Sequence, residues 1–281
     1  MNRQDKKKSV VVFIHIPKTA GTTLSDVLKH QYRKKNTLII HGNIEEKEAE
    51  FKEKYYADRN QIYLIKGHMT FGVHQFLDCH CKYITFVRNP IDRILSVYYY
   101  LSKNQRHPQY HLVKGKTLEE FVSSNTAHHN GQTRFIAGRY DPRERWQPAN
   151  LLDRAKKNLQ ENFVIVGLTE RFDETLIVLK RKLEWSNMPF YVKQNKSNKP
   201  ATETIAKSTL TLIKNRNSLD VELYRYAKEI FETQLNRQND CFEDELRKFS
   251  WLNKIYQPMG NTYSMSRFFV LKIKKSIMQI G

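Results

Sequence analysis

The stretch FIHIPKTAGTTL, residues 13–24, predicts the end of a strand, a tight loop and the start of a helix. It closes an apolar, β-branched run at 10–16, which is typical of a central parallel strand covered on both faces. After the loop, apolar residues recur at helical spacing from Leu24 to Leu28. We therefore expect the loop at 17–21 to join a buried strand to a helix.

This loop has the composition of an anion-binding site. Backbone N–H groups at a helix start lack partners and carry the positive end of the helix dipole. Glycine allows an anion to approach closely, hydroxyls add donors, and lysine adds a full charge. Lysine precedes glycine here, whereas the triphosphate pattern G-x-x-x-x-G-K-[ST] has the reverse order. An ordinary strand-to-helix turn with a capping threonine is the simpler alternative. The residues concerned are Lys18, Thr19, Gly21, Thr22 and Thr23.

Strands and helices alternate along the rest of the chain. Further strands are predicted at 37–42, 62–68, 83–88 and 163–168, and helices at 44–60, from Pro90, at 172–184 and at 202–235. The polar stretch 103–150 is weakly periodic and is assigned no element. This alternation predicts a single α/β domain with a P-loop-like central parallel sheet flanked by helices. We expect a polar tail at 1–9, the domain at 10–235, and a C-terminal extension at 236–281 that packs on the domain or on a partner.

Arg88 and Ser96 form a second candidate group. Arg88 closes a predicted strand, and Asn89 and Pro90 then supply an N-cap and a first helical residue. Ser96 follows eight residues after Arg88, about two helical turns away. A guanidinium at the carboxyl end of a parallel strand faces the crevice where such sheets bind ligands, and its fork suits phosphate oxygens. The alternative is a local ion pair between Arg88 and Asp92.

His68 is a third candidate, because it ends the predicted strand at 62–68. A neutral imidazole there can accept a proton near pH 7 if this strand lies beside the first one. A lone histidine is more often a structural residue with its own hydrogen bonds.

The composition favours an anionic partner. Of 281 residues, 48 are Lys or Arg and 29 are Asp or Glu, a net charge of +19. This balance suits nucleic acid, an anionic membrane, an acidic glycan or a nucleotide, although a solvated basic surface also explains it. Three cysteines argue against a disulfide-stapled fold. Cys79 and Cys81 flank His80, with His74 nearby, but no second pair follows, so we expect no metal site.

The order of three motifs carries a family resemblance. PKTAGTT after one strand, GH after the next and RNPIDR-x-x-S after a third resemble the sulfotransferase superfamily that uses 3′-phosphoadenosine 5′-phosphosulfate (PAPS). The motifs are most similar to the branch of heparan sulfate and uronyl 2-O-sulfotransferases and their bacterial relatives. The resemblance continues through NFVIVGLTERFDETL (162–176) and covers about residues 10–235. It implies the sulfotransferase fold and an enzyme that moves a sulfuryl group from PAPS to a carbohydrate hydroxyl.

The resemblance also implies a role for each motif residue. His68 would be the catalytic base that takes the acceptor proton, and Lys18 would stabilise the leaving oxygen. The product would be adenosine 3′,5′-bisphosphate (PAP), and no metal would be needed. The implied donor-binding residues are Lys18, Thr19, Ala20, Gly21, Thr22 and Thr23 for the 5′-phosphosulfate, Arg88 and Ser96 for the 3′-phosphate, and Lys196 and Ser197 in a basic loop that closes over the nucleotide.

The acceptor side is predicted from HHNGQTRFIAG, residues 128–138, which resembles a segment near the acceptor cleft of bacterial relatives. Gln132 and Arg134 would contact a carboxylate or sulfate, and His128 or His129 would assist. A surface loop with local hydrogen bonds is the alternative. We expect a hydroxylated glycan as acceptor, and the net charge is compatible with an anionic one.

The two ends of the chain bear on location. The run at 10–16 has only seven residues, contains a histidine and lacks a following cleavage site, so it does not resemble a signal peptide. Nothing approaches the ~18 apolar residues of a membrane span. We therefore expect a cytoplasmic protein of bacterial origin. At 267–281 apolar residues share one helical face between lysines, and we expect packing on protein, with peripheral membrane contact as the alternative.

Three other functions stay open at this point. A P-loop kinase would need the G-K-[ST] order, which is missing. A non-catalytic nucleic-acid or polyanion-binding protein fits the charge, but no helix-turn-helix, zinc-finger or RNP signature is present, so we expect no nucleic-acid partner. An inactive sulfotransferase-like protein would not need Lys18, His68, Arg88 and Ser96, which are all intact.

Overall fold

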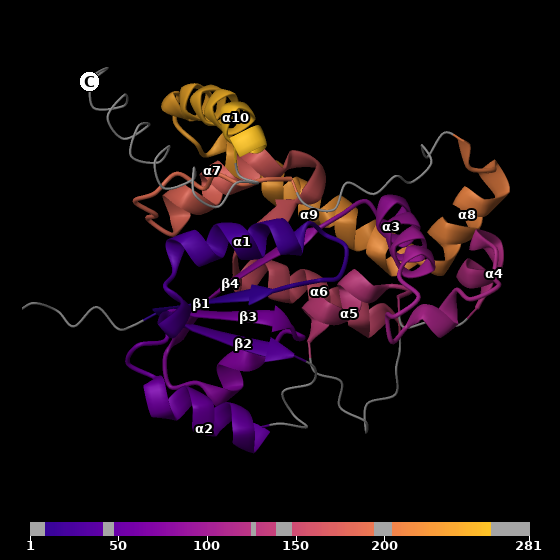
Figure 1. The fold of residues 1–281 in the computed structure, drawn as a ribbon, viewed down its shortest axis with the longest axis horizontal. Helices are drawn as coiled ribbons and strands as arrows, with labels where there is room; N and C mark the ends of the chain where they lie inside the picture. The colour runs from indigo at the N-terminus through magenta and orange to yellow at the C-terminus, as the bar shows by residue number, and fades with distance from the viewer. Residues whose placement is uncertain (1–8, 42–47, 125–127, 139–147, 194–203, 260–281) are drawn as a thin grey trace, which may run out of the picture.

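A parallel sheet forms the centre of the molecule (Figure 1). The computed structural model describes residues 9–41, 48–124, 128–138, 148–193 and 204–259. Its five-stranded sheet has the order β2-β3-β1-β4-β5, and each neighbouring pair is parallel. The strands are β1 (Ser9–Ile14), β2 (Thr37–His41), β3 (Leu64–His68), β4 (His80–Val87) and β5 (Phe163–Leu168).

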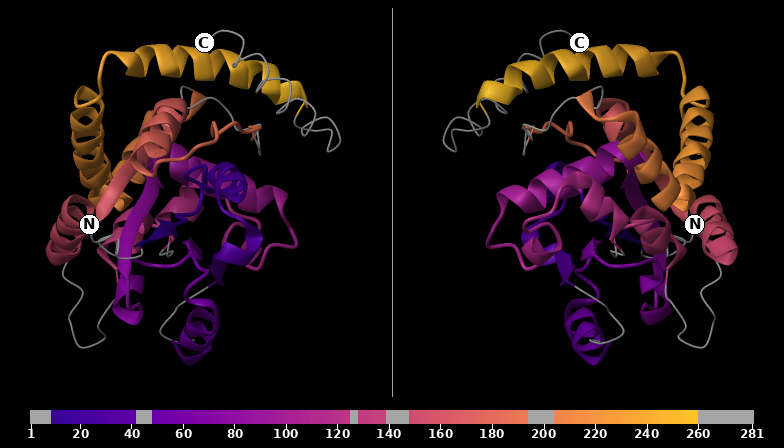
Figure 2. Two further views of the ribbon diagram at one scale, coloured as in Figure 1. Left: turned by 90° about the vertical axis from the view of Figure 1, so that its left-hand side faces the viewer. Right: turned by 90° about the vertical axis from the view of Figure 1, so that its right-hand side faces the viewer.

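Helices cover both faces of this sheet. Those in the described ranges are α1 (Gly21–Gln31), α2 (Glu48–Asp58), α3 (Pro90–Lys103), α4 (Leu118–Ser123), α5 (Gly131–Ala137), α6 (Pro148–Glu161), α7 (Phe172–Lys182), α8 (Lys207–Arg216), α9 (Ser218–Asn236) and α10 (Cys241–Met259). Figure 2 shows α10 and α2 at opposite ends of the molecule. None of these helices combines the length and the apolar surface that a bilayer crossing requires.

Alternation along β1 divides the core between the two faces of the sheet. Val10 and Val12 pack in the apolar cluster that includes residues of α2, α5, α6 and α9. Val11 and Phe13 pack in the cluster on the other face, with residues of α1, α7 and α10. A strand buried on both faces must be apolar throughout, and this explains the continuous run in the sequence.

The register of β1 brings three segments to one edge of the sheet. Ile14 pairs with Gly67 of β3 on one side and with Thr85 of β4 on the other. The Thr85 hydroxyl also donates a hydrogen bond to the Ile14 carbonyl, 2.9 Å away. Because parallel strands end at the same edge, the loop after β1, the end of β3 and the end of β4 lie together there.

The structure confirms the predicted fold class, and each predicted strand lies within a few residues of its expected bounds. Two element predictions were wrong. The segment 202–235 is not one helix, because it breaks at Asn217, whose buried side chain bonds the Ile213 carbonyl and the Asn130 N–H. The stretch 103–150, assigned no element, contains α4, α5 and the start of α6. Of the polar tail predicted at 1–9, Ser9 belongs to β1 and the rest lies outside the described residues, as does the stretch 267–281.

A buried ion pair joins three helices behind the sheet edge. Arg93 of α3 lies 3.7 Å from Asp220 of α9, and their side chains are 1% and 0% exposed. The Asp220 carboxylate also accepts hydrogen bonds from the backbone N–H groups of Gln132 and Thr133 in α5, at 3.2 and 2.8 Å. One carboxylate therefore fixes α5 between α3 and α9.

We expect Asp220→Ala to lower the free energy of unfolding by about 3–5 kcal/mol, because the buried Arg93 guanidinium loses its partner. The control is Glu222→Ala on the same helix, which removes an exposed ion pair with Arg225 and should cost about 0–1 kcal/mol. Urea denaturation followed by circular dichroism measures both values. Equal, small losses in the two variants would contradict the role given to the buried pair.

Candidate functional site

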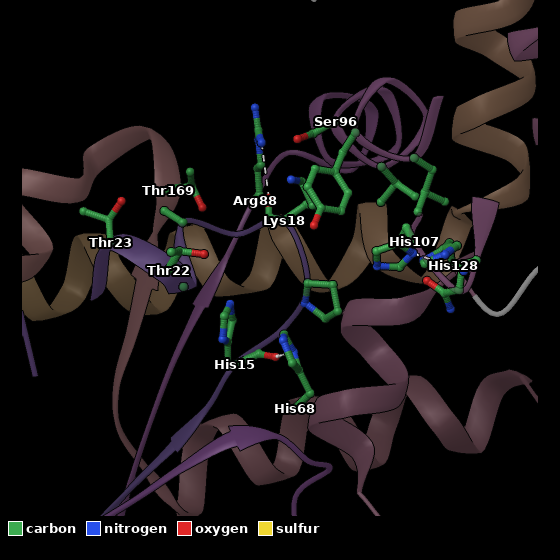
Figure 3. Close-up of a pocket in the computed structure, with 17 residues that line it drawn as sticks. His15, Lys18, Thr22, Thr23, His68, Arg88, Ser96, His107, His128 and Thr169 are labelled. Atoms are coloured by element: carbon green, nitrogen blue, oxygen red, sulfur yellow. Dashed lines mark hydrogen bonds between the residues drawn. The ribbon is translucent and has the colours of Figure 1, made fainter. Parts of the chain in front are cut away.

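A cavity of about 500 Å³ lies at the carboxyl edge of the sheet. The loop after β1, the ends of β3 and β4, and the helix α3 all contribute to its wall (Figure 3). The structure thus brings together most of the side chains that the three sequence motifs single out. The predicted residues that line the cavity are Lys18, Ala20, Gly21, Thr22, Thr23, His68, Arg88, Ser96 and His128.

The loop after β1 has an unusual backbone. Lys18 and Ala20 have φ values of 69° and 62°, in the left-handed region that residues other than glycine seldom adopt. Such residues turn backbone N–H groups toward a common centre, an arrangement that binds anions. Thr19 lies between them, and its buried hydroxyl donates to the Ile16 carbonyl at 2.9 Å. The Thr19 side chain therefore holds the loop and does not line the cavity.

The helix α1 begins against this cavity. Ala20 is its N-cap residue and offers no side-chain hydrogen bond, and the first turn contains no acidic residue. The N–H groups of the first turn are thus left for an external acceptor, at the positive end of the helix dipole. Gly21, Thr22 and Thr23 of this turn all line the cavity.

Lys18 and Arg88 place two cations in the same half-buried space. The Lys18 ammonium lies 3.8 Å from the centre of the Tyr100 ring. Burial, together with the Arg88 charge, lowers the pKa of Lys18 to about 8. Burial also lowers the pKa of Arg88, whose guanidinium donates to the Lys18 carbonyl at 3.2 Å. An anion bound between these two groups would relieve the unfavourable charge.

The tautomer of His68 follows from its hydrogen bond. Its Nδ1 lies 2.8 Å from the backbone carbonyl of His15. A carbonyl can only accept, so Nδ1 carries the proton and the lone pair of the neutral ring is on Nε2. The ring also stacks on the ring of His15, with centroids 4.2 Å apart. His68 is therefore oriented as a proton acceptor.

Gln132 has a different position from the one predicted for it. Its side chain is 1% exposed and bonds both main-chain groups of Arg88: Oε1 accepts from the N–H at 2.8 Å, and Nε2 donates to the carbonyl at 2.9 Å. The amide thus makes the two backbone hydrogen bonds that a neighbouring strand would make at the end of β4. These bonds fix the backbone position from which the Arg88 side chain extends. The geometry gives Gln132 a structural role in place of contact with an acceptor.

The other predicted acceptor residues are divided. His128 lines the cavity, and burial with the Arg93 charge lowers its pKa to about 4. His129 is buried, Arg134 is half-buried, and neither lines the cavity. Lys196 and Ser197 lie outside the described residues.

Several residues of the cavity wall were missed by the sequence motifs. They are His15, Tyr100, His107, Gln109 and Thr169. Two of them had a usable signal. His15 interrupts an apolar run just before the loop, and Tyr100 follows Ser96 by four residues on the same helical face. The segment with His107 and Gln109 has no periodic pattern that would have placed it here.

Among the described residues, no group of three His, Cys, Asp or Glu side chains has the arrangement of a metal site. Cys79 and Cys81 are free thiols at the start of β4, far along the strand from the cavity edge.

The comparison with protein families identifies the chain. The model of the sulfotransferase family matches residues 4–227, which is most of the sequence. The chain belongs to the sulfotransferase family. The resemblance inferred from the three motifs is thereby confirmed.

Curated relatives include several carbohydrate sulfotransferases. Galactose-3-O-sulfotransferase 3 of Mus musculus is 24% identical over 86% of this chain and 61% of its own length. Heparin sulfate O-sulfotransferase of Drosophila melanogaster is 25% identical over 86% and 77%, and uronyl 2-sulfotransferase of Homo sapiens is 24% identical over 79% and 62%. The chain thus spans less than two thirds of some of these relatives. Among solved structures, mouse sulfotransferase SULT7A1 complexed with PAP aligns over 87% of this chain and 84% of its own, with 13% identity and a TM-score of 0.37.

The lowered pKa of Lys18 predicts pH-dependent binding of anions. We expect the affinity for sulfate, whose charge stays constant, to fall as the pH rises between about 7 and 9.5, because Lys18 loses its proton above about 8 when no anion is bound. Calorimetry or the sulfate-induced rise in melting temperature measures the change. In Lys18→Arg the guanidinium stays charged, so the dependence should be flat. A dependence of equal steepness in the variant would exclude Lys18 as its source.

Proposed function

We propose that this protein is a sulfotransferase that moves a sulfuryl group from PAPS to a carbohydrate hydroxyl. The observation that carries the proposal is the meeting of an anion-binding loop, the Arg88–Ser96 pair and His68 in one cavity. Membership of the family and the glycan sulfotransferases among the relatives support it.

The cavity residues fit the two phosphate-bearing ends of the donor. The left-handed loop and the uncapped start of α1 would hold the 5′-phosphosulfate. Arg88 and Ser96 line the same cavity (Figure 3) and would hold the 3′-phosphate. Burial lowers the pKa of both Lys18 and Arg88, and a bound anion would favour the charged form of each.

His68 and Lys18 would perform the transfer. PAPS supplies the sulfuryl group. The lone pair on Nε2 of His68 accepts the proton of the acceptor hydroxyl as its oxygen forms a bond to sulfur. The bond between sulfur and the bridging oxygen breaks, and the Lys18 ammonium stabilises the charge that develops on that oxygen. PAP and the sulfated acceptor then leave, and His68 returns its proton to solvent.

The acceptor would enter at the end of the cavity away from Thr22 and Thr23. Figure 3 shows His107 and His128 at this end. The cavity wall also includes Tyr100 and Gln109, so imidazole, amide and phenol groups are available near the Lys18 ammonium, which lies over the Tyr100 ring. Such groups exchange hydrogen bonds with sugar hydroxyls, and an aromatic ring adds apolar contact. A hydroxylated glycan is therefore the acceptor class that we propose.

Ligand-induced stabilisation tests the donor and the competing functions together. PAP should raise the melting temperature more than ATP with magnesium or heparin does, because only a ligand of the folded state stabilises it. A rise with ATP and magnesium alone would indicate a kinase, and a rise with heparin alone would indicate a polyanion-binding protein. Transfer of labelled sulfate from PAPS to a panel of glycans then identifies the acceptor.

We expect His68→Ala to reduce the turnover number by about 10²–10⁴-fold and to leave the Kd for PAP unchanged, because the imidazole acts on the acceptor proton. Turnover assays and calorimetry with PAP give the two values. The control is His30→Ala, which replaces an exposed histidine at the end of α1. Equal loss of PAP binding and turnover in His68→Ala would exclude a role as base.

We expect Arg88→Ala to weaken PAP binding by about 10–100-fold, the effect of losing a charge-assisted hydrogen bond. Binding of adenosine 5′-phosphate, which lacks the 3′-phosphate, should change little. The ratio of the two Kd values, measured in wild type and variant, isolates the 3′-phosphate contact. An equal loss for both nucleotides would contradict the assignment.

A further inference from the structure

We propose that His15 is a positioning residue for His68: its imidazole joins the donor-binding loop to the base and fixes the plane of the His68 ring. This inference rests on the proposed function, because it takes His68 as the base of the transfer.

Two contacts with His15 define the orientation of His68. The His15 carbonyl accepts the Nδ1–H of His68 at 2.8 Å, which fixes one edge of the ring. The His15 imidazole stacks on the face of the His68 ring, with ring centroids 4.2 Å apart and an angle of 30° between the ring planes (Figure 3). This contact limits rotation of the His68 ring about its side-chain bonds. His68 lies at the exposed end of β3. A base must be held within a narrow range of angles to work, so this support matters for the reaction.

His15 is itself held from several sides. Its ring stacks on Phe13 at 5.5 Å. Its backbone N–H donates to the carbonyl of Gly67, the residue before His68, at 2.9 Å. Its ring also lies against Gly21, where a Cβ atom would come within 1.9 Å of Cδ2 and 2.0 Å of Nε2. The ring therefore lies between the donor loop and the base and is in contact with both.

The charge state of His15 suits this position. Burial, with the charges of His68, Lys66 and Lys18, lowers the pKa of His15 to about 3, so its ring stays neutral. When His68 takes up the acceptor proton, the neighbouring ring adds no second positive charge. A flat, neutral group is thus compatible with both states of the base.

The alternative is that His15 only fills space in the core. Loss of a core side chain would lower stability and would not separate turnover from donor binding. The two interpretations therefore predict different results for His15→Ala: a positioning role lowers kcat without changing the Kd for PAP, and a space-filling role does not separate the two.

We expect His15→Ala to lower kcat by about 10–100-fold, the effect of misplacing a catalytic group, while the Kd for PAP changes little. His15→Asn, which keeps a planar side chain of smaller size, should retain more of the turnover than His15→Ala. Unfolding in urea identifies any general loss of structure. An unchanged kcat in His15→Ala, or an equal loss of turnover and PAP binding, would overturn the proposal.

Gly21→Ala supplies an independent test, because it adds an atom against the His15 ring, whereas His15→Ala removes the ring. The backbone of Gly21 is not in the left-handed region, so alanine is strained only by its contact with the His15 ring. We expect Gly21→Ala to displace that ring and to lower kcat. In the His15→Ala background the space is open, and Gly21→Ala should then cost little more. Additive losses in the double variant would contradict the contact.

An NMR measurement separates this proposal from the proposed function. The ring nitrogen signals of His68, assigned from their loss in His68→Ala, report its tautomer and order without any turnover. They should shift or broaden in His15→Ala and stay unchanged in His30→Ala. If wild-type protein transferred no sulfate while His15→Ala disturbed these signals, the function would fail and the positioning would stand. Identical His68 signals in wild type and His15→Ala would overturn the positioning.

Discussion

The alignment of β1 with β3 and β4 is the constraint on which the rest of the site depends. Ile14 pairs with Gly67 and with Thr85, so three chain segments leave the sheet at one edge. A shift of one residue in either pairing would exchange the two faces of a strand and expose its apolar side chains. The same packing that stabilises the core therefore places His68 and Arg88 on either side of Lys18.

The described wall of the cavity contains two cations, Lys18 and Arg88, and acidic residues outside the cavity wall hold the segments around them in place. Arg93 is paired with Asp220, and Glu170 accepts the backbone N–H of Asn89, next to Arg88. The Lys18 ammonium lies over the aromatic ring of Tyr100. The strained loop conformation adds roughly 1–3 kcal/mol per left-handed residue. A bound anion would offset part of the repulsion between the cations and part of the backbone strain. Functional sites commonly reduce the stability of a protein in this way.

Local signals predicted the fold and about half of the cavity. The strands could be predicted because both of their faces are buried, which gives continuous apolar runs. The loop could be predicted because its lysine, glycine and threonines lie within a few residues of one another. Ser96 follows Arg88 by eight residues, about two helical turns, and this spacing alone indicated that the two residues belong together. The positions of His15 and Gln132 depend on contacts between distant segments. Asn217 breaks a helix through a hydrogen bond with Asn130, 87 residues away, and no pattern within a short window predicts such a contact.

The helix α10 determines where the folded domain ends. The family match ends at residue 227, inside α9. Beyond it, Phe242 and Phe249 of α10 are buried in the apolar cluster with α1 and α7. Asn253 accepts the N–H of Tyr191 at 3.0 Å, and the Gln257 amide donates to the Tyr191 carbonyl at 2.8 Å. The cooperative folding unit is therefore longer than the region that similarity identifies, and a chain cut at that boundary would lose part of its core.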